Sequence, residues 1–216
     1  MATRAYHSPT RQAQSSATRL RVVVAAQECF EENGYVASTM RAIAQRAQVS
    51  VETVHQTAAK RDLLLAAFTL AVTGEDGPVR LLERPEPKAI LDDPDPVSRL
   101  RGLAAFVTGI NTRVLRLWRA FEQAAAADPQ VAAEYADLIT RMRGELRDAL
   151  TVFAERGDLR EDRPVDELAD LLWLLVLPDQ YFRLCDQAGW SVERYGAWLA
   201  ESMLDLLLAS RHRPTP

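Results

Sequence analysis

Residues 39–56 constrain the fold most, because they read as two short helices joined by a tight turn. In the first of these, apolar residues recur at the spacing of one helix face, at Met40, Ile43, Ala44 and Ala47. Thr39 stands immediately before this helix, where its hydroxyl can accept a hydrogen bond from a free backbone N–H group. We therefore predict that the first helix begins directly after Thr39.

The second helix is predicted to begin after Ser50, which is also a good capping residue. Glu52 then lies in the first turn, where the helix dipole favours a negative charge. The helical period directs Val54 toward a core, and it leaves Val51, Glu52, His55 and Gln56 on the opposite face. Two short helices with an exposed polar face predict a helix-turn-helix that binds DNA, although any helical hairpin is the alternative.

Three neighbouring segments carry a family resemblance. They read TRLRVVVAAQECFEENGY at residues 18–35, STMRAIAQRAQVS at 38–50 and KRDLL at 60–64. At these positions and spacings, over about a quarter of the chain, the sequence resembles the TetR family of bacterial transcriptional repressors. The resemblance implies an N-terminal helix-turn-helix domain followed by a helical domain that binds an inducer and forms a dimer.

The sequence departs from the family pattern at three positions. Gln48 stands in the turn where the family usually has Gly, His55 replaces the usual Tyr, and Ala58 replaces the usual Phe. These departures bear on the DNA sequence that is read rather than on the fold. The predicted DNA-binding residues are Tyr35, Thr39, Arg41, Ser50, Val51, Glu52, Thr53, His55, Gln56 and Lys60. For Lys60, a solvated lysine with no phosphate partner is the alternative.

The charge distribution separates a basic N-terminal part from an acidic remainder. Residues 1–72 hold eight Arg or Lys and five Asp or Glu, whereas residues 73–216 hold eighteen and twenty-five. The net charge of −4 argues against a protein that coats nucleic acid without sequence preference. The basic N-terminal part favours local contact with phosphates instead.

Four regions are predicted from the patterning. Residues 1–16 are expected to be a mobile tail, although Arg4 and Arg11 allow a basic arm in the minor groove instead. Residues 17–72 are expected to form the helix-turn-helix domain, with its first helix at 18–32, and Asn33 and Gly34 are expected to end that helix. The proline-rich segment 73–96 is a linker or broken helix, and residues 97–216 form a helical effector-binding and dimerisation domain.

The expected fold is all-α, with a three-helix helix-turn-helix domain, a C-terminal helical domain and about nine helices. Gly109 suggests an interruption in a helix at 97–127, Asp128 and Pro129 begin the next helix, and Pro178 suggests a kink in a helix at 165–187. The longest apolar run has seven residues, which is too short for a membrane span, and no signal peptide is visible, so we expect a cytoplasmic protein.

No catalytic motif, cofactor loop or metal-binding spacing can be recognised, and the two cysteines do not suggest a zinc site or a disulfide framework. We therefore expect no enzyme activity, no cofactor and no metal. Aromatic residues in the helical domain indicate either an ordinary core or a cavity for a small, largely apolar effector. The predicted ligand-binding residues are Phe106, Ile110, Arg113, Trp118, Phe121, Tyr135, Met142, Trp173 and Tyr181. Further polar possibilities are Asn111, Gln123 and Asp179.

A homodimer is predicted because one helix-turn-helix reads few base pairs and a two-fold dimer fits a palindromic operator. The helix at 165–187 is apolar around much of its circumference, and the helix at 191–209 carries Trp198, Leu204 and Leu207 outside its own stripe. The alternative is that the helix at 165–187 is buried by its own chain. The sequence therefore predicts a ligand-responsive repressor, with a constitutive DNA-binding or partner-binding protein as the alternative.

Overall fold

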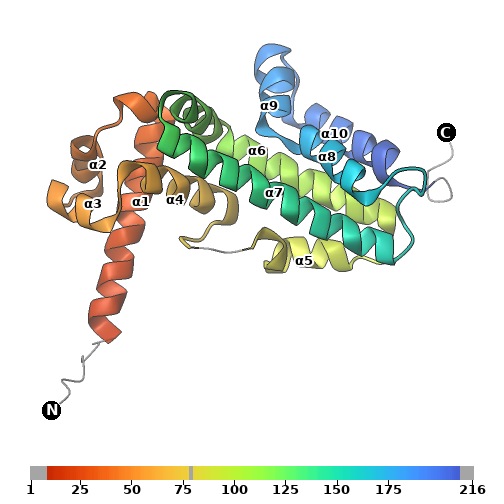
Figure 1. Ribbon diagram of the computed structural model, residues 1–216, viewed down its shortest axis with the longest axis horizontal. Helices are drawn as coiled ribbons and strands as arrows, with labels where there is room; N and C mark the ends of the chain where they lie inside the picture. The colour runs from red at the N-terminus through yellow and green to blue at the C-terminus, as the bar shows by residue number, and fades with distance from the viewer. Residues whose placement is uncertain (1–8, 78–79, 210–216) are drawn as a thin grey trace.

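The computed structural model describes residues 9–77 and 80–209. Within these ranges the chain has ten α-helices, and its only β-type pairing is an isolated antiparallel bridge between Leu159 and Leu208. The all-α prediction is confirmed. Figure 1 shows an elongated molecule with α1–α4 grouped at one end and α8 and α10 toward the other.

The N-terminal head contains α1 (Pro9–Ala37), α2 (Met40–Ala47), α3 (Val51–Thr57) and α4 (Lys60–Thr73). Helix α1 begins at Pro9 rather than at residue 18, so the predicted start of the first helix is wrong and residues 9–16 are helical. A run of residues without helix-breaking Gly or Pro follows Pro9 and extends the helix. Residues 1–8, including Arg4 of the possible basic arm, lie outside the described residues.

The predicted end of the first helix at residues 33–34 is visible as a break inside α1. Gly34 has φ 72° and ψ 174°, a conformation that favours glycine. Ser38 stabilises this bend, because its hydroxyl lies 2.8 Å from the carbonyl oxygen of Cys29 and 2.7 Å from that of Gly34. The bend sets the direction in which the chain enters α2.

The segment predicted as a linker or broken helix contains a short 3₁₀ turn, η1 (Leu81–Glu83), and α5 (Pro85–Asp92). Helix α5 packs against α6 at Gly102, where a Cβ atom would lie only 2.9 Å from Ile90 Cγ2. The proline-rich composition therefore marks the helix starts and turns of a docked segment, because Pro85 occupies the first turn of α5.

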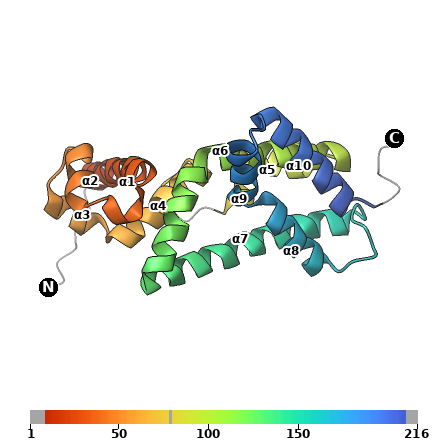
Figure 2. The same ribbon diagram turned by 90° about the horizontal axis from the view of Figure 1, so that it is seen from above.

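The body is built on two long helices, α6 (Pro96–Ala127) and α7 (Pro129–Glu155). Helix α6 continues through Gly109 without the expected interruption, because a single glycine costs a long packed helix only about 1 kcal/mol. Asp128 caps α7 as predicted, with its Oδ1 accepting a hydrogen bond from Gln130 N at 2.8 Å. The two helices meet at this turn beside the head (Figure 2).

The C-terminal part contains α8 (Val165–Val176), α9 (Pro178–Tyr181), the π-type turn η2 (Phe182–Gln187) and α10 (Val192–Leu207). The kink predicted at Pro178 is a complete break between α8 and α9, because Leu177 is extended with ψ 141°. Asn111 of α6 stabilises the break by donating hydrogen bonds to the carbonyl oxygen of Val176 at 3.1 Å and to the Tyr195 hydroxyl at 3.0 Å. Asn111 is therefore a structural residue in the core.

The molecule has two hydrophobic cores, and the first of them crosses the predicted boundary between the head and the body. The first core joins α1–α4 to the C-terminal half of α6 and the N-terminal half of α7. The second core joins α5, the other halves of α6 and α7, α8 and α10. Helix α6 therefore packs against both the head and the rest of the body.

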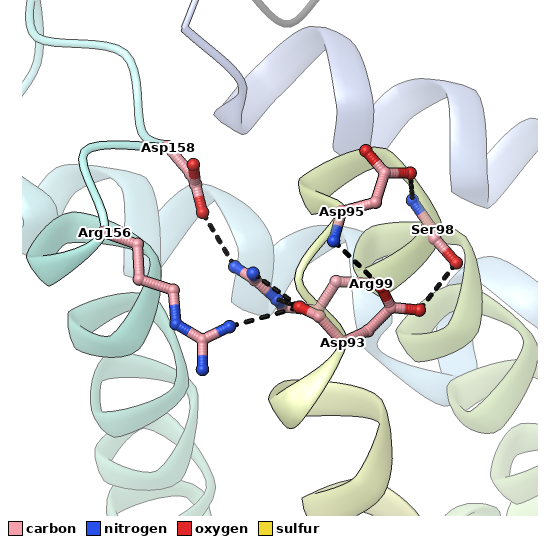
Figure 3. Close-up of polar contacts among 6 residues, drawn as sticks. All are labelled: Asp93, Asp95, Ser98, Arg99, Arg156 and Asp158. Atoms are coloured by element: carbon pink, nitrogen blue, oxygen red, sulfur yellow. Dashed lines mark hydrogen bonds and ion pairs between the residues drawn. The ribbon is translucent and has the colours of Figure 1, made fainter.

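A buried arginine holds the far end of the body together (Figure 3). Arg99 is fully buried in α6; its Nη1 lies 2.9 Å from Asp158 Oδ2. Its Nε and Nη2 donate hydrogen bonds to the carbonyl oxygen of Asp93, at 2.9 and 2.7 Å. The guanidinium also lies 4.6 Å from the centre of the Phe153 ring. This arrangement connects the α5–α6 turn, α6 and the end of α7.

Candidate nucleic-acid interface and effector cavity

The helix-turn-helix is held by the two predicted side-chain caps. Thr39 Oγ1 accepts a hydrogen bond from Ala42 N, and Ser50 Oγ accepts one from Thr53 N, each at 3.0 Å. Both capping hydroxyls lie on exposed surface. The Thr39 hydroxyl can therefore cap its helix and still donate its own hydrogen to a phosphate oxygen, whereas the Ser50 hydroxyl also lies 2.8 Å from Thr53 Oγ1.

The turn between α2 and α3 takes its shape at Gln48. This residue has φ 56° and ψ 46°, and it is the only non-glycine residue with positive φ in the described ranges. Its backbone N–H group bonds the carbonyl oxygens at the end of α2, as a left-handed helix cap does. The residue that departs from the family pattern thus adopts the conformation for which glycine is the usual choice.

Helix α3 presents a polar face beside a buried anchor. Val54 is completely buried, whereas Glu52, His55 and Gln56 are exposed and Val51 is 39% exposed. Gln56 Nε2 donates a hydrogen bond to Glu52 Oε1 at 3.2 Å, so the two side chains hold each other on that face. Figure 1 shows α3 at the end of the molecule remote from α8 and α10.

The other predicted contact residues lie near this face. Lys60 begins α4, and its Nζ lies 4.3 Å from the centre of the Tyr35 ring and 3.4 Å from the carbonyl oxygen of Val36. Burial lowers the pKa of Lys60, so a nearby anion would favour its charged form. Arg41 is exposed on α2 and has no ion-pair partner among the described residues. Ala58, where the family usually has Phe, packs at the edge of the first core.

A cavity of about 460 Å³ lies between α6, α7, α8 and the start of α9. Its lining residues are Trp118, Glu122, Tyr135, Ala136, Ile139, Trp173, Leu177 and Asp179. Its size falls within the range of small-molecule sites. Trp118, Tyr135 and Trp173 were predicted as ligand-binding residues, and Asp179 as a polar possibility, so the structure brings these four together.

Six predicted ligand-binding residues are not among those lining the cavity. Phe121 is fully buried against Phe68 and Tyr135, and Tyr181 is buried against Tyr195. The other four belong to the first core or the surface, at Phe106, Ile110, Arg113 and Met142. Arg113 is exposed and donates to the carbonyl oxygen of Ala71 at 3.4 Å, and Gln123 is exposed at a shallow hollow of the surface.

The cavity contains a carboxylate that sequence reasoning missed. Glu122 lies one helical turn after Trp118, and this spacing places both residues on one face of α6. Burial, and then the charge of Asp179, raise the pKa of Glu122, while Arg119 opposes the shift. Asp179 is held in place by Trp118, whose Nε1 donates a hydrogen bond to Asp179 Oδ2 at 2.9 Å.

The cavity wall contacts the head directly. The Trp118 ring lies 5.9 Å from the Phe68 ring of α4 and 5.3 Å from the Tyr135 ring of α7. Tyr135 lies 5.5 Å from Phe121, which also packs on Phe68. Trp118 and α4 are therefore separated by no further layer of side chains.

None of the helices in the described part of the chain combines the length and the apolar composition that a membrane span needs.

Comparison with known proteins gives a family model and a set of solved structures. Residues 22–67 match the model described as bacterial regulatory proteins, tetR family. A TetR-family regulator from Mesorhizobium loti shares 19% identity, with a TM-score of 0.70 over 90% of this chain and 98% of that one. A search of curated protein sequences finds no significant match.

Two further solved structures were determined with small molecules. The SmeT–triclosan complex has 20% identity and a TM-score of 0.68, over 93% of this chain and 98% of that one; SmeT represses a multidrug efflux pump of Stenotrophomonas maltophilia. A regulator from Saccharomonospora viridis in complex with choline has 21% identity and a TM-score of 0.69, over 90% and 99%. Residues 22–67 therefore match a domain of the tetR family of bacterial regulatory proteins, and about nine tenths of the chain shares the fold of these solved regulators.

Proposed function

We propose that the protein is a ligand-responsive repressor that binds a palindromic operator as a homodimer and is released by a small effector with a largely apolar body. The observation that carries the DNA-binding part is the exposed polar face of α3 beside the buried Val54. An α-helix presented in this way can enter the major groove and contact base edges.

In this proposal, α3 reads the bases and the surrounding residues hold the phosphates. Gln56 pairs with adenine, Glu52 accepts from a cytosine amino group, and Val51 or the Thr53 methyl group contacts a thymine methyl group. His55 lies on the same exposed face. The phosphate contacts are assigned to Tyr35, Thr39, Arg41, Ser50 and Lys60, which surround that face. Glu52 would also repel phosphates in a wrongly placed complex and thus exclude other sequences.

The test separates base reading from phosphate binding on an operator selected from random duplex DNA. Gln56→Ala should lower preference at one base position by roughly 1–3 kcal/mol. Lys60→Ala should weaken all sequences alike and reduce the slope of log K against log salt by about 0.9. Lys88→Ala, which removes the same charge from an exposed site on α5, is the matched control. Unchanged operator binding in both head variants would contradict these assignments.

The dimer interface is proposed on α8 and α10, which pack together at the end of the body. Leu174 is 47% exposed in the protomer, and Leu171, Trp198 and Leu206 are half-buried along the same two helices. Leu204 and Leu207 were expected to be free for the interface, but they are 6% and 0% exposed within their own chain, so the structure corrects that expectation.

The interface test therefore uses Leu174→Arg, because this position is exposed and the variant can fold. It should produce a folded monomer that no longer binds a two-half-site operator, as measured by light scattering and operator titration. Val24→Arg, at a head residue that is 39% exposed, is the control for introducing the same charge. An unchanged dimer mass for Leu174→Arg would overturn this interface.

The cavity beside Trp118 and Trp173, which is open to solvent, supports effector control, because the constitutive alternative gives it no role. Similar proteins solved with triclosan and with choline support it further. A ligand that stabilises the protein in a thermal-shift screen should weaken operator binding by about 5–150-fold. Hits that bind the cavity and leave operator affinity unchanged would contradict effector control.

A further inference from the structure

We propose that the cavity between α6, α7 and α8 is a site for organic cations with an apolar, aromatic or branched body. This inference rests on the proposed effector control, and it adds the charge class of the effector. Three properties of the cavity support it. The walls are aromatic, two carboxylates line the cavity, and Arg119 lies within ion-pair distance of both carboxylates without a hydrogen bond to either.

The aromatic side chains of Trp118, Tyr135 and Trp173 line the cavity from three different helices. The faces of aromatic rings attract cations, and the attraction increases when the cation is desolvated. Ile139 and Leu177 complete an apolar lining suited to the body of such a ligand. Arg143 already lies 5.6 Å from the Trp173 ring, but its charge is balanced by an ion pair with Asp170.

Two carboxylates, Glu122 and Asp179, line the same cavity. The hydrogen bond from Trp118 Nε1 occupies Asp179 Oδ2 and fixes the orientation of that carboxylate. Two negative charges in a partly desolvated space favour a cation and oppose an anion.

Arg119 is the one positive charge within ion-pair distance of these carboxylates among the described residues. Its Nη1 lies 3.9 Å from Glu122 Oε2 and 4.0 Å from Asp179 Oδ1, so neither contact has the length of a hydrogen bond. Its guanidinium is placed instead 4.5 Å from the centre of the Phe182 ring. One loosely held positive charge thus faces two negative charges, and the cavity keeps a net negative charge.

Arg119 also connects the cavity to the head. With Phe30 and Gly34 of α1, and with Phe182, it lines a hollow of about 320 Å³ between the head and the body. A ligand cation that takes the two carboxylates competes with Arg119 for them. The arginine then loses its anchor at the junction between α1 and α6, which gives the cation a route to the position of the DNA-binding head.

The test compares two ions of nearly equal size and shape but opposite charge, tetraphenylphosphonium and tetraphenylborate. Calorimetric titration of the full chain should show the cation binding at least about tenfold more tightly than the anion, a difference of about 1.4 kcal/mol. Equal affinities, or tighter binding of the anion, would overturn the proposal. So would the absence of binding by either ion.

Three substitutions give opposite expectations for the cation. Glu122→Gln and Asp179→Asn should each weaken cation binding on the order of tenfold, because each removes one carboxylate charge. Arg119→Gln should strengthen it by several-fold, since the competing internal cation is lost. Glu155→Gln removes the same kind of charge from an exposed position at the end of α7 and should change nothing.

Failure of this inference can be distinguished from failure of the proposed function. If Arg119→Gln does not strengthen binding and neither carboxylate variant differs from Glu155→Gln, the cation site is refuted. A neutral ligand that releases the operator where the phosphonium ion does not bind also refutes it, while effector control stands. A cation that binds as predicted without affecting the operator supports the site and contradicts effector control.

Discussion

The exposed polar face of α3 and the cavity of the body are built by different kinds of contact. In the head, Thr39 and Ser50 bond backbone groups three residues away, and Gln56 bonds Glu52 four residues away. In the body, the residues at the cavity come from α6, α7, α8 and α9, and Trp118 bonds Asp179 across 61 positions. The polar face of α3 is therefore shaped by local contacts, whereas the cavity forms only in the completed fold.

The largest expected effect comes from breaking a long-range contact of the body. Arg99→Ala should lower the free energy of unfolding by about 3–5 kcal/mol, because it leaves Asp158 as a buried carboxylate without its arginine. Urea denaturation measures the loss. The exposed neighbour Arg101, changed to Ala, is the control and should stay within about 0.5 kcal/mol of the native chain.

A double variant sharpens this prediction. Arg99→Met combined with Asp158→Leu removes both charges and should be more stable than Arg99→Ala alone, because no buried carboxylate is left without its Arg99 ion pair. If the double variant is the less stable of the two, Asp158 stabilises the core through contacts other than its ion pair with Arg99, because both variants lack the hydrogen bonds of Arg99 to Asp93 and its contact with Phe153.

The difference between local contacts in the head and long-range contacts in the body also explains which features could be predicted from the sequence. The caps at Thr39, Ser50 and Asp128 and the bend at Gly34 follow from short patterns, and the structure confirms them. The family resemblance over the head and the all-α class were also readable. Sequence patterns covering only a few residues are sufficient in each of these cases because the interacting groups are close together in the chain.

The rest depends on contacts that no local pattern reveals. Asn111 was considered for a ligand site, yet it caps the end of α8 through Val176, 65 positions away. Phe121 and Tyr181 belong to the same predicted set of aromatic residues as Trp118, and only packing decides which of these rings line the cavity. Glu122 belongs to no recognisable sequence motif, because Asp179, the other carboxylate of the cavity, is distant from it in the sequence.

In the head, removing either cap should have an intermediate effect. Thr39→Ala and Ser50→Ala should each lower the free energy of unfolding by about 1 kcal/mol, because a backbone N–H group at the start of α2 or α3 loses its partner. Thr140→Ala removes an exposed hydroxyl inside α7 and serves as the control, with a smaller loss expected. Losses no larger than that of the control would show that local capping does not hold the head.

The turn offers a smaller change of opposite sign. Gln48→Gly should raise the free energy of unfolding by roughly 0.5 kcal/mol, because relief of the left-handed strain, about 1–2 kcal/mol, is partly offset by the entropy of glycine in the unfolded chain. Thermal unfolding measures the gain. Gln45→Gly places the same residue inside α2, and it should instead cost about 1 kcal/mol. A loss at both positions would refute strain at Gln48.

The smallest expected effect concerns the pH dependence of the cavity. Burial and the neighbouring Asp179 raise the pKa of Glu122 in the folded protein above its ordinary value, with Arg119 opposing the shift. In the window between the ordinary and the raised pKa, the folded state binds more protons than the unfolded state, so this residue makes stability fall as the pH rises through the window. Glu122→Gln removes that penalty. The melting temperature of the variant should therefore rise relative to that of the native chain as the pH is raised from about 4 toward about 8. This pH range covers the ordinary pKa of a carboxyl group and values raised above it. A melting-temperature difference that stays constant over this range would show that the cavity does not disfavour the ionised form of Glu122, and that its carboxylate is as well solvated as the charged residues around α3.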